Sequence, residues 1–311
     1  MRMRKIALGA ALLLSLFGLL PLFTGPFWTY LLAEILAWGL FALAFDLLYG
    51  YGGMLSLGQS VFFGVGAYGG ALAILRLECG PWSALMLGTA AALLLAVLLG
   101  PLLARGSGHG FIILTMVLAL IFYLLALQLR WLTGGDDGLA VAAPAIFGLP
   151  LADPIVNYYF TLAIVALSFS FARWLASTPL GRAFVLVREN PRRAAALGYD
   201  VKMIKLIVIA ISGGLSGLAG ALYLFTARFV SADLFHWMIA ANPLVWTLLG
   251  GAGSLFGPLL GTVILLLARE WLSSWWSYGY PILVGVLIIM VARFAPQGLW
   301  GMLRLRWRSS G

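Results

Sequence analysis

The stretch ALMLGTAAALLLAVLLGPLLA, residues 84–104, contains no charged side chain. At a rise of about 1.5 Å per residue, a helix of this length crosses the roughly 30 Å hydrocarbon layer of a bilayer. Similar apolar stretches recur along the chain, among them Ile6–Phe23 and Phe111–Leu129. The sequence therefore predicts an all-α polytopic membrane protein.

The composition of the whole chain supports this fold class. Hydrophobic residues make up 63% of the 311 residues and charged residues only 9%, against about half and about a quarter in a soluble domain. Cys79 is the only cysteine, and the two histidines, His109 and His236, lie far apart in sequence. We therefore expect no disulfide framework, no metal site and no cofactor bound by this chain.

We expect about ten transmembrane helices, some of them broken by glycine or proline. The first apolar run follows MRMRK and resembles a signal peptide, but it is long and no clear cleavage site follows, so we interpret it as a retained helix. The predicted spans are residues 6–23, 30–49, 58–76, 82–104, 109–131, 156–173, 204–225, 236–250, 256–270 and 277–293.

Basic residues divide unequally between the two sides of this topology. With ten spans both termini share one side, which holds 15 of the 19 basic residues, all except Arg76, Arg130, Arg228 and Arg269. Because Lys and Arg are enriched in cytoplasmic loops, both termini are predicted to be cytoplasmic. The net charge of +9 is then accounted for by membrane orientation, and we expect no nucleic-acid partner.

Residues 1–311 are expected to form a single transmembrane domain with two long connections. An extracytoplasmic loop, residues 132–155, is rich in glycine and proline. A cytoplasmic loop, residues 174–203, contains the charged segment RENPRRAAALGYDVK (188–202).

Glycines gather in three segments, residues 50–70, 212–221 and 250–261. In the second, small residues recur four apart, which favours close helix packing. The other two are too rich in glycine and proline for regular helix, and paired broken segments are typical of transporters. They could provide a hinge, line the pathway or only pack tightly; the residues concerned are Gly52, Gly53, Gly58, Gly253, Gly257, Pro258 and Gly261.

The charged segment predicts a short capped helix. Asn190 suits the N-cap, Pro191 the first helical position, and Gly198 the left-handed residue after the end. About two helical turns are not stable alone in water, so we expect this helix to dock against the bundle or another protein. Its remaining candidate contact residues are Arg188, Glu189, Arg192, Arg193, Ala194 and Ala195.

Five motifs together resemble the permease subunits of ATP-binding-cassette (ABC) importers for branched-chain amino acids. The likeness runs from about residue 30 to residue 301. The motifs are GYGGMLSLGQSVFFGVGAY (50–68), LTGGDDGL (132–139), TPLGRAFVLVRENPRRAAALGYDVKMIKLIVIAISGGLSGLAGALY (178–223), LVWTLLGGAGSLFGPLLG (244–261) and APQGLWG (295–301).

The resemblance implies partners and a location. Residues 188–200 would be the coupling loop that docks on a cytoplasmic ATPase, although Arg192, Arg193 and Ala194 replace the Glu-Ala-Ala of the strict motif. The implied partners are a sibling permease subunit in a heterodimer, two cytoplasmic subunits that bind ATP and Mg, an extracytoplasmic substrate-binding protein, and membrane lipid. The implied location is the bacterial inner (plasma) membrane, crossed several times.

Other functions find less support in the residues. None of the three lysines lies in a G-x-x-x-x-G-K-[ST] phosphate-binding loop, so the chain is not expected to be an enzyme or to hydrolyse ATP itself. A secondary transporter usually carries ionisable residues deep in the membrane, and here mid-membrane positions are almost wholly uncharged.

The favoured function is therefore an ABC importer permease for branched-chain or other hydrophobic amino acids. A self-sufficient secondary amino-acid transporter, or an ABC permease for a small amide such as urea, are the alternatives. Candidates for the substrate path are Ser56, Gln59, Thr115, Ser212, Ser216 and Asn242.

Overall fold

The computed structural model describes residues 21, 25–146, 148–273, 279–294 and 298–301, so the first predicted span lies almost wholly outside it. The elements in chain order are α2 (Pro26–Asp46), the π-helix η1 (Leu47–Tyr51), α3 (Gln59–Leu77), α4 (Pro81–Leu103), α5 (Gly108–Gln128), α6 (Arg130–Thr133), β1 (Leu139–Ala140), β2 (Ala145–Ile146), β3 (Leu149–Pro150), α7 (Pro154–Ser177), α8 (Pro179–Glu189), α9 (Pro191–Ala196), α10 (Val201–Ala227), β4 (Phe229–Val230), the 3-10 helix η2 (Ala232–Phe235), α11 (Trp237–Gly250), α12 (Phe256–Ser273) and α13 (Gly279–Phe294).

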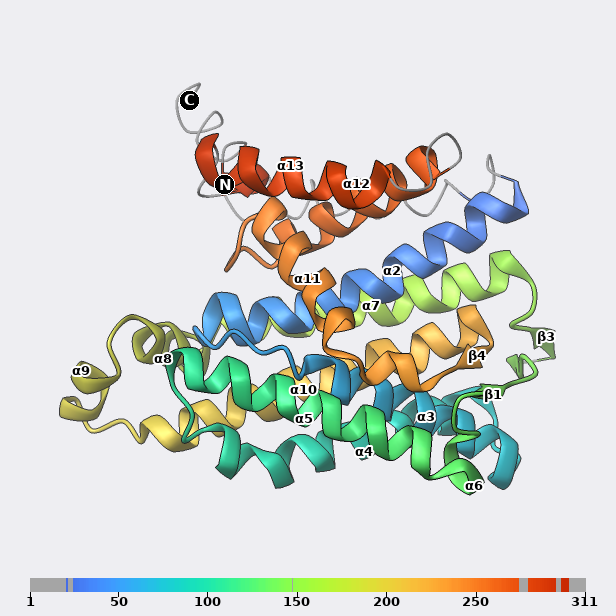
Figure 1. Ribbon diagram of the computed structural model, residues 1–311, viewed down its shortest axis with the longest axis horizontal. Coiled ribbons are helices and arrows are strands. Elements are labelled where there is room, and N and C mark those ends of the chain that lie inside the picture. Colours follow the sequence, from blue (N-terminus) through green and yellow to red (C-terminus); the bar gives the residue numbers. More distant parts are fainter. Residues whose placement is uncertain (1–20, 22–24, 147, 274–278, 295–297, 302–311) are drawn as a thin grey trace.

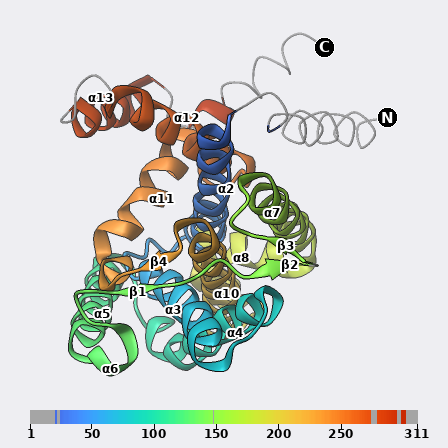
Figure 2. The same ribbon diagram turned by 90° about the vertical axis from the view of Figure 1, so that its right-hand side faces the viewer.

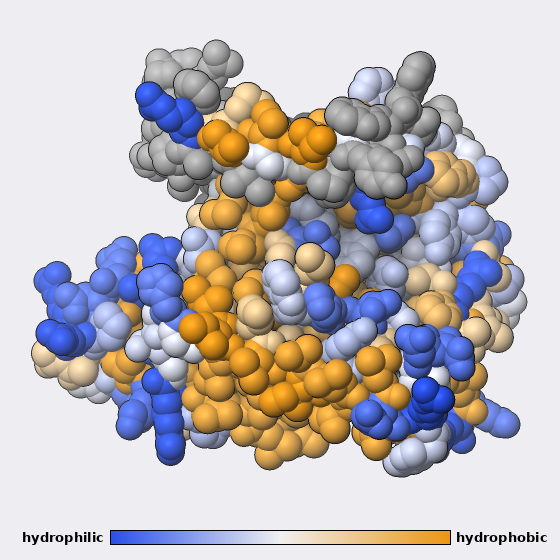
Figure 3. Space-filling view, in the orientation of Figure 1, coloured by the Kyte–Doolittle hydropathy of each residue, from blue (hydrophilic) through white to orange (hydrophobic). Residues whose placement is uncertain are grey.

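The described residues form a helical bundle that confirms the predicted fold class. Seven stretches are long and apolar enough to cross a membrane: α2 with η1, α3, α4, α5, α7, α10 and α12. Most of these helices run along the long axis of Figure 1, and Figure 2 looks along that axis. A broad apolar band lies between polar ends of the molecule (Figure 3), as expected for a protein that spans a bilayer.

Two predicted spans correspond to shorter helices. Residues 236–250 form α11, whose 14 residues extend only about 21 Å. In Figures 1 and 2 α11 rises from the side of α5 toward α12 instead of running along α2. Residues 277–293 are largely covered by α13, which has 16 residues. The count of ten spans and the cytoplasmic placement of both termini stay predictions.

The helices begin at the signals that the sequence provides. Proline is the first residue of α2, α4, α7, α8 and α9, where its missing N–H costs no helical hydrogen bond. Side chains also cap five N-termini of the described helices by accepting a backbone N–H; they belong to Asp153, Thr178, Asn190, Asp200 and His236.

The segment predicted as a cytoplasmic loop, residues 174–203, is mostly helical, which corrects the expectation of one short helix in an irregular connection. Helix α7 continues to Ser177, and α8 and α9 follow. One face of α8, including Phe184 and Val187, is buried against the bundle, and burial of an amphipathic face stabilises short helices. In the predicted outer loop, β2 pairs with β3, and β1 pairs with β4 from beyond α10.

Helix α2 lies at the centre of the bundle. In its spanning window, 89% of the residues are buried, against 22% for α5. The Trp38 ring of α2 stacks on Phe63 of α3 at 4.9 Å between centroids, and it also contacts Tyr223 of α10 and Trp246 of α11. The outer faces of α4 and α5 expose many large apolar side chains, which suits contact with lipid or another membrane subunit.

Glycines allow α3, α4 and α10 to approach closely. A Cβ atom on Gly66 of α3 would collide with the backbone of Gly217 of α10, and one on Gly88 of α4 would collide with the Gly66 carbonyl oxygen. These contacts confirm the packing role predicted for residues 212–221.

We expect Gly66→Ala to lower the stability of the bundle by about 1–3 kcal/mol, because the added methyl group has only backbone to displace. The matched control is Gly110→Ala on α5, where nothing lies within 4 Å of the added atom. The measurement is the thermal unfolding midpoint of each purified variant in one detergent. Equal midpoints for both variants would contradict the packing account.

Candidate transport site

Helix α9 has the start and the end that the sequence predicts. The Asn190 side chain accepts a hydrogen bond from the Arg193 N–H at 3.0 Å, and Pro191 is the first helical residue. Gly198 has a φ of +87°, and the Tyr199 N–H donates to the Ala194 carbonyl at 3.1 Å. This closing bond and the left-handed glycine form a Schellman-type end.

The small alanine face of α9 is divided between the bundle and the surface. Ala194 is fully buried, whereas Ala195 and both arginines of the helix, Arg192 and Arg193, are exposed. Beyond the helix, Leu197 is 62% exposed. Helix α9 therefore presents a surface that is both basic and apolar at one end of the molecule, where Figure 1 shows it projecting from the bundle.

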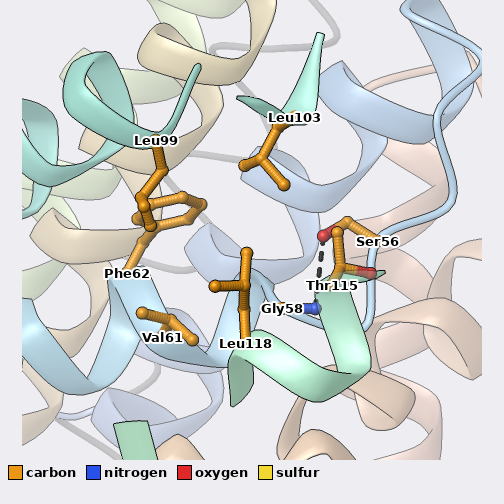
Figure 4. A pocket seen from close by; sticks show the side chains of 8 residues that line it. All are labelled: Ser56, Gly58, Val61, Phe62, Leu99, Leu103, Thr115 and Leu118. Atoms are coloured by element: carbon orange, nitrogen blue, oxygen red, sulfur yellow. Dashed lines mark hydrogen bonds between the residues drawn. The ribbon is translucent and has the colours of Figure 1, made fainter. Parts of the chain in front are cut away.

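Two of the candidate substrate-path residues line a narrow crevice between α3, α4 and α5. Ser56 and Thr115 lie on one side of it, facing Leu99 and Phe62 (Figure 4). Its empty volume is about 210 Å³ including the open mouth. No ionisable side chain is among the residues that line the crevice, which are Ser56, Gly58, Val61, Phe62, Leu99, Leu103, Thr115 and Leu118.

The two hydroxyl groups also satisfy the irregular backbone between η1 and α3. The Thr115 hydroxyl accepts the Leu57 N–H at 3.1 Å, and the Ser56 hydroxyl accepts the Gly58 N–H at 3.2 Å. Buried backbone groups need such partners, so these side chains fix the wall of the crevice.

Gln59 and Ser212 form a separate buried pair. The Gln59 amide nitrogen donates to the Ser212 hydroxyl, which donates to the Ala44 carbonyl at 2.9 Å. One turn along α10, the buried Ser216 hydroxyl has no hydrogen-bond partner among the described residues. Asn242 lies on α11 and is partly buried. Gln59, Ser212, Ser216 and Asn242 do not line the crevice.

The two glycine-rich segments that the sequence pairs in the two halves meet in space. A Cβ on Gly50 would collide with the backbone of Gly253. Close packing also involves Gly257, which lies against Gly250, and Gly261, which lies against Trp246. Pro258 falls in the first turn of α12, where proline is tolerated, so the break in the chain precedes it.

The Asp46 side chain stabilises the irregular backbone at this break. The sequence did not reveal this role. The side chain is fully buried. One carboxylate oxygen accepts the Gly253 N–H at 2.6 Å and the other accepts the Leu255 N–H at 3.0 Å. An ionised carboxylate only accepts hydrogen bonds, so both bonds fit the charged form. The available signal was a lone acidic residue at the end of an apolar span, next to a glycine-rich segment.

Arg188 reaches the same place from α8. Its guanidinium donates to the Gly50 carbonyl and interacts electrostatically with Asp46. It also lies 3.8 Å from the carboxylate of Glu189, and its side chain is 37% exposed. Asp46, Arg188 and Gly50, together with Gly253 and Leu255, are called the junction below.

The comparisons with known proteins agree with this architecture. The model of the family described as branched-chain amino acid transport system / permease component matches residues 27–292. The chain belongs to this permease family. It is therefore a transport subunit of the ABC type and a multi-pass protein of the inner membrane.

Individual relatives are permeases of the same kind. The high-affinity branched-chain amino acid transport system permease protein LivM of Escherichia coli is 30% identical over 286 residues, which cover 84% of this chain and 67% of the relative. The autoinducer 2 import system permease protein LsrC of Salmonella typhimurium is 29% identical over 174 residues, 51% of this chain and 47% of the relative. No solved structure matches the permease.

We expect Asp46→Asn to destabilise the permease by about 1–3 kcal/mol, because the amide nitrogen cannot accept a hydrogen bond and one buried N–H of the 251–255 loop is left unpaired. Asp136→Asn, a substitution at an exposed residue, is the control of equal charge change. Unfolding midpoints in detergent at neutral pH provide the measurement, and an unchanged Asp46→Asn midpoint would contradict the assignment.

Proposed function

We propose that this chain is the permease subunit of an ABC importer that moves branched-chain or other hydrophobic amino acids into the cytoplasm. Separate subunits would bind ATP and Mg and hydrolyse the ATP. The observation that carries the proposal is α9, a capped helix with one buried alanine and an open basic and apolar surface.

Helix α9 is suited to receive a mechanical displacement. Its N-cap bond and its left-handed glycine fix the conformation of both ends, and Ala194 anchors it on the bundle. A rigid helix transmits a displacement to its neighbours, whereas a poorly capped helix would unwind instead. The exposed side chains of Arg192, Arg193 and Leu197 would contact the ATPase, and residues 188–200, which include α9, would be the coupling loop.

The crevice supports a small, net-neutral substrate with an aliphatic part. Five of its side chains are purely hydrocarbon, those of Val61, Phe62, Leu99, Leu103 and Leu118, and no charge faces the space. The hydroxyl groups of Ser56 and Thr115 offer polar contacts for an amino acid backbone. In this conformation the crevice is nearly closed, because its accessible volume of about 10 Å³ holds about one water molecule, so an amino acid would pass only after the helices that line it separate.

The relatives favour amino acids over the autoinducer as the cargo. The match to the branched-chain amino acid permease covers 84% of this chain, whereas the match to the autoinducer 2 permease covers 51%. A sibling permease would cover part of the exposed apolar surface of α4 and α5, and a substrate-binding protein would meet the end that carries β1 to β4.

The proposal is tested by isolating the tagged permease from its native membrane in mild detergent and identifying the proteins that accompany it. We expect a sibling permease and ATP-binding subunits with the wild type. Gly198→Val should lose the ATP-binding subunits and uptake, because a β-branched residue resists the φ of +87°.

Gly198→Asn is the matched control for that variant, since asparagine tolerates the left-handed region and a Cβ at this position meets nothing within 4 Å. It should retain its partners. Normal uptake by Gly198→Val, or transport by the permease alone without ATP, would contradict the proposal.

We expect the double variant Arg192→Glu, Arg193→Glu to bind the ATPase subunits at least about tenfold more weakly, because truncating or reversing charges at a contact commonly changes affinity by this amount. Arg182→Glu, at an exposed position of α8, is the single-charge control. Binding is measured with the purified subunits at several salt concentrations. Equal affinity of all variants for the ATPase subunits would contradict the placement of α9 in the interface.

A further inference from the structure

The junction joins the end of one helix to the start of another. Helix α2 passes into η1, where the Gly50 carbonyl accepts a hydrogen bond from Arg188. Helix α12 begins directly after Leu255, whose N–H donates to Asp46. A helix carries partial negative charge at its C-terminus and partial positive charge at its N-terminus. The arginine and the aspartate therefore each lie at the helix end that favours their charge.

Glycines leave the space that these two side chains occupy. A Cβ on Gly53 would collide with the side chain of Arg188, and one on Gly50 would collide with the Asp46 carboxylate. A Cβ on Gly253 would lie 3.5 Å from Arg188 Nη1 and 3.3 Å from the Gly50 carbonyl oxygen. Arg188 is thus fitted between the two glycine-rich segments and is not simply a surface charge.

Arg188 also belongs to the last turn of α8, three residues before α9 begins at Pro191. The neighbouring Val187 and, one turn earlier, Phe184 are buried on the inner face of α8. Only Asn190 separates α8 from α9, so a displacement of α9 would act directly on the end of α8. Arg188 is the side chain there that is hydrogen-bonded to the junction.

The 251–255 loop at the other side of the junction is held in an unfavourable conformation. Gly251, Gly253 and Leu255 all have positive φ, and for leucine at +60° this region is disfavoured. The bonds from Asp46 hold Gly253 and Leu255 in place. Backbone strain of this kind clusters at switch regions, which makes the 251–255 loop the segment suited to change conformation when the junction is distorted.

We propose that Arg188 is the positioning residue that transmits displacement of α9 to the 251–255 loop, through the Gly50 carbonyl and Asp46. The inference rests on the proposed contact between α9 and the ATPase. In this mechanism α12 is the element that moves within the membrane. Loss of Arg188 would uncouple ATP hydrolysis from transport, while the subunits would stay assembled.

The test uses the full transporter complex in a Cys79→Ser background, with two reporter cysteines introduced one at a time. Ala252→Cys, at an exposed position of the loop, reports the loop, and Ala196→Cys, at an exposed position of α9, reports ATPase docking. The rate of maleimide labelling is measured without nucleotide and with the ATP-bound state trapped. Each reporter is combined with Arg188→Gln, Arg188→Lys and the exposed control Arg182→Gln.

With wild-type Arg188 we expect Ala252→Cys labelling to change at least about threefold between the two states, and Ala196→Cys to be protected by the ATPase. Arg188→Gln should abolish the change at Ala252 and raise the ATP hydrolysed per substrate transported, with Ala196 still protected. Arg188→Lys, which keeps the charge and a donor, should recover part of the response, and Arg182→Gln should behave as wild type.

Other outcomes overturn the inference in distinguishable ways. An undiminished response at Ala252 in Arg188→Gln, or no response in the wild type, refutes transmission through the junction. Loss of Ala196 protection in Arg188→Gln alone would make Arg188 an anchor of α9 and not a transmitter. Absence of Ala196 protection with wild-type Arg188 would refute the proposed ATPase contact itself, and the inference with it.

Discussion

The hydrocarbon layer offers no hydrogen-bond partner to the backbone, and the structure of this permease depends on that constraint. An unpaired N–H or carbonyl at membrane depth costs several kcal/mol, so the chain must satisfy these groups internally. Regular helix does so over seven stretches. Where the helices break, side chains from other helices supply the missing partners.

The breaks follow one pattern. Thr115 accepts the Leu57 N–H ahead of α3, Asp46 accepts two N–H groups ahead of α12, and Arg188 donates to a carbonyl near the end of η1. In each case the partner comes from a different part of the chain, which ties the irregular segment to another helix. At these breaks the irregular backbone is therefore fixed by polar contacts.

The same contacts relate the fold to transport. Thr115 satisfies the backbone and also lines the crevice, so the crevice wall and the structural bond share one side chain. Asp46 and Arg188 connect the centre of the bundle to the α8–α9 end. In the proposed mechanism, energy supplied outside the bilayer would reach α12 along this route, without any ionisable residue in the crevice.

Sequence alone determined those features that depend on local chemistry. Apolar runs of about twenty residues have the length of membrane-spanning helices, and the Asn190, Pro191 and Gly198 signals place the ends of α9 because caps and left-handed glycines act within a few residues. The small residues of α10 similarly predicted close packing. Family membership was also accessible, because the motifs that resemble the permeases are contiguous in the chain.

Only the tertiary structure decided the rest. Residues 174–203 looked like a loop because α8 is stabilised by burial of Phe184 and Val187 against distant helices. Helix α11 was predicted as a full span because the hydropathy of a segment does not reveal the direction in which its helix runs through the bundle. The bonds between Asp46 and residues 253 and 255 join positions more than two hundred apart. No local pattern encodes such pairs, since a carboxylate finds its donors only after the helices that carry them have packed.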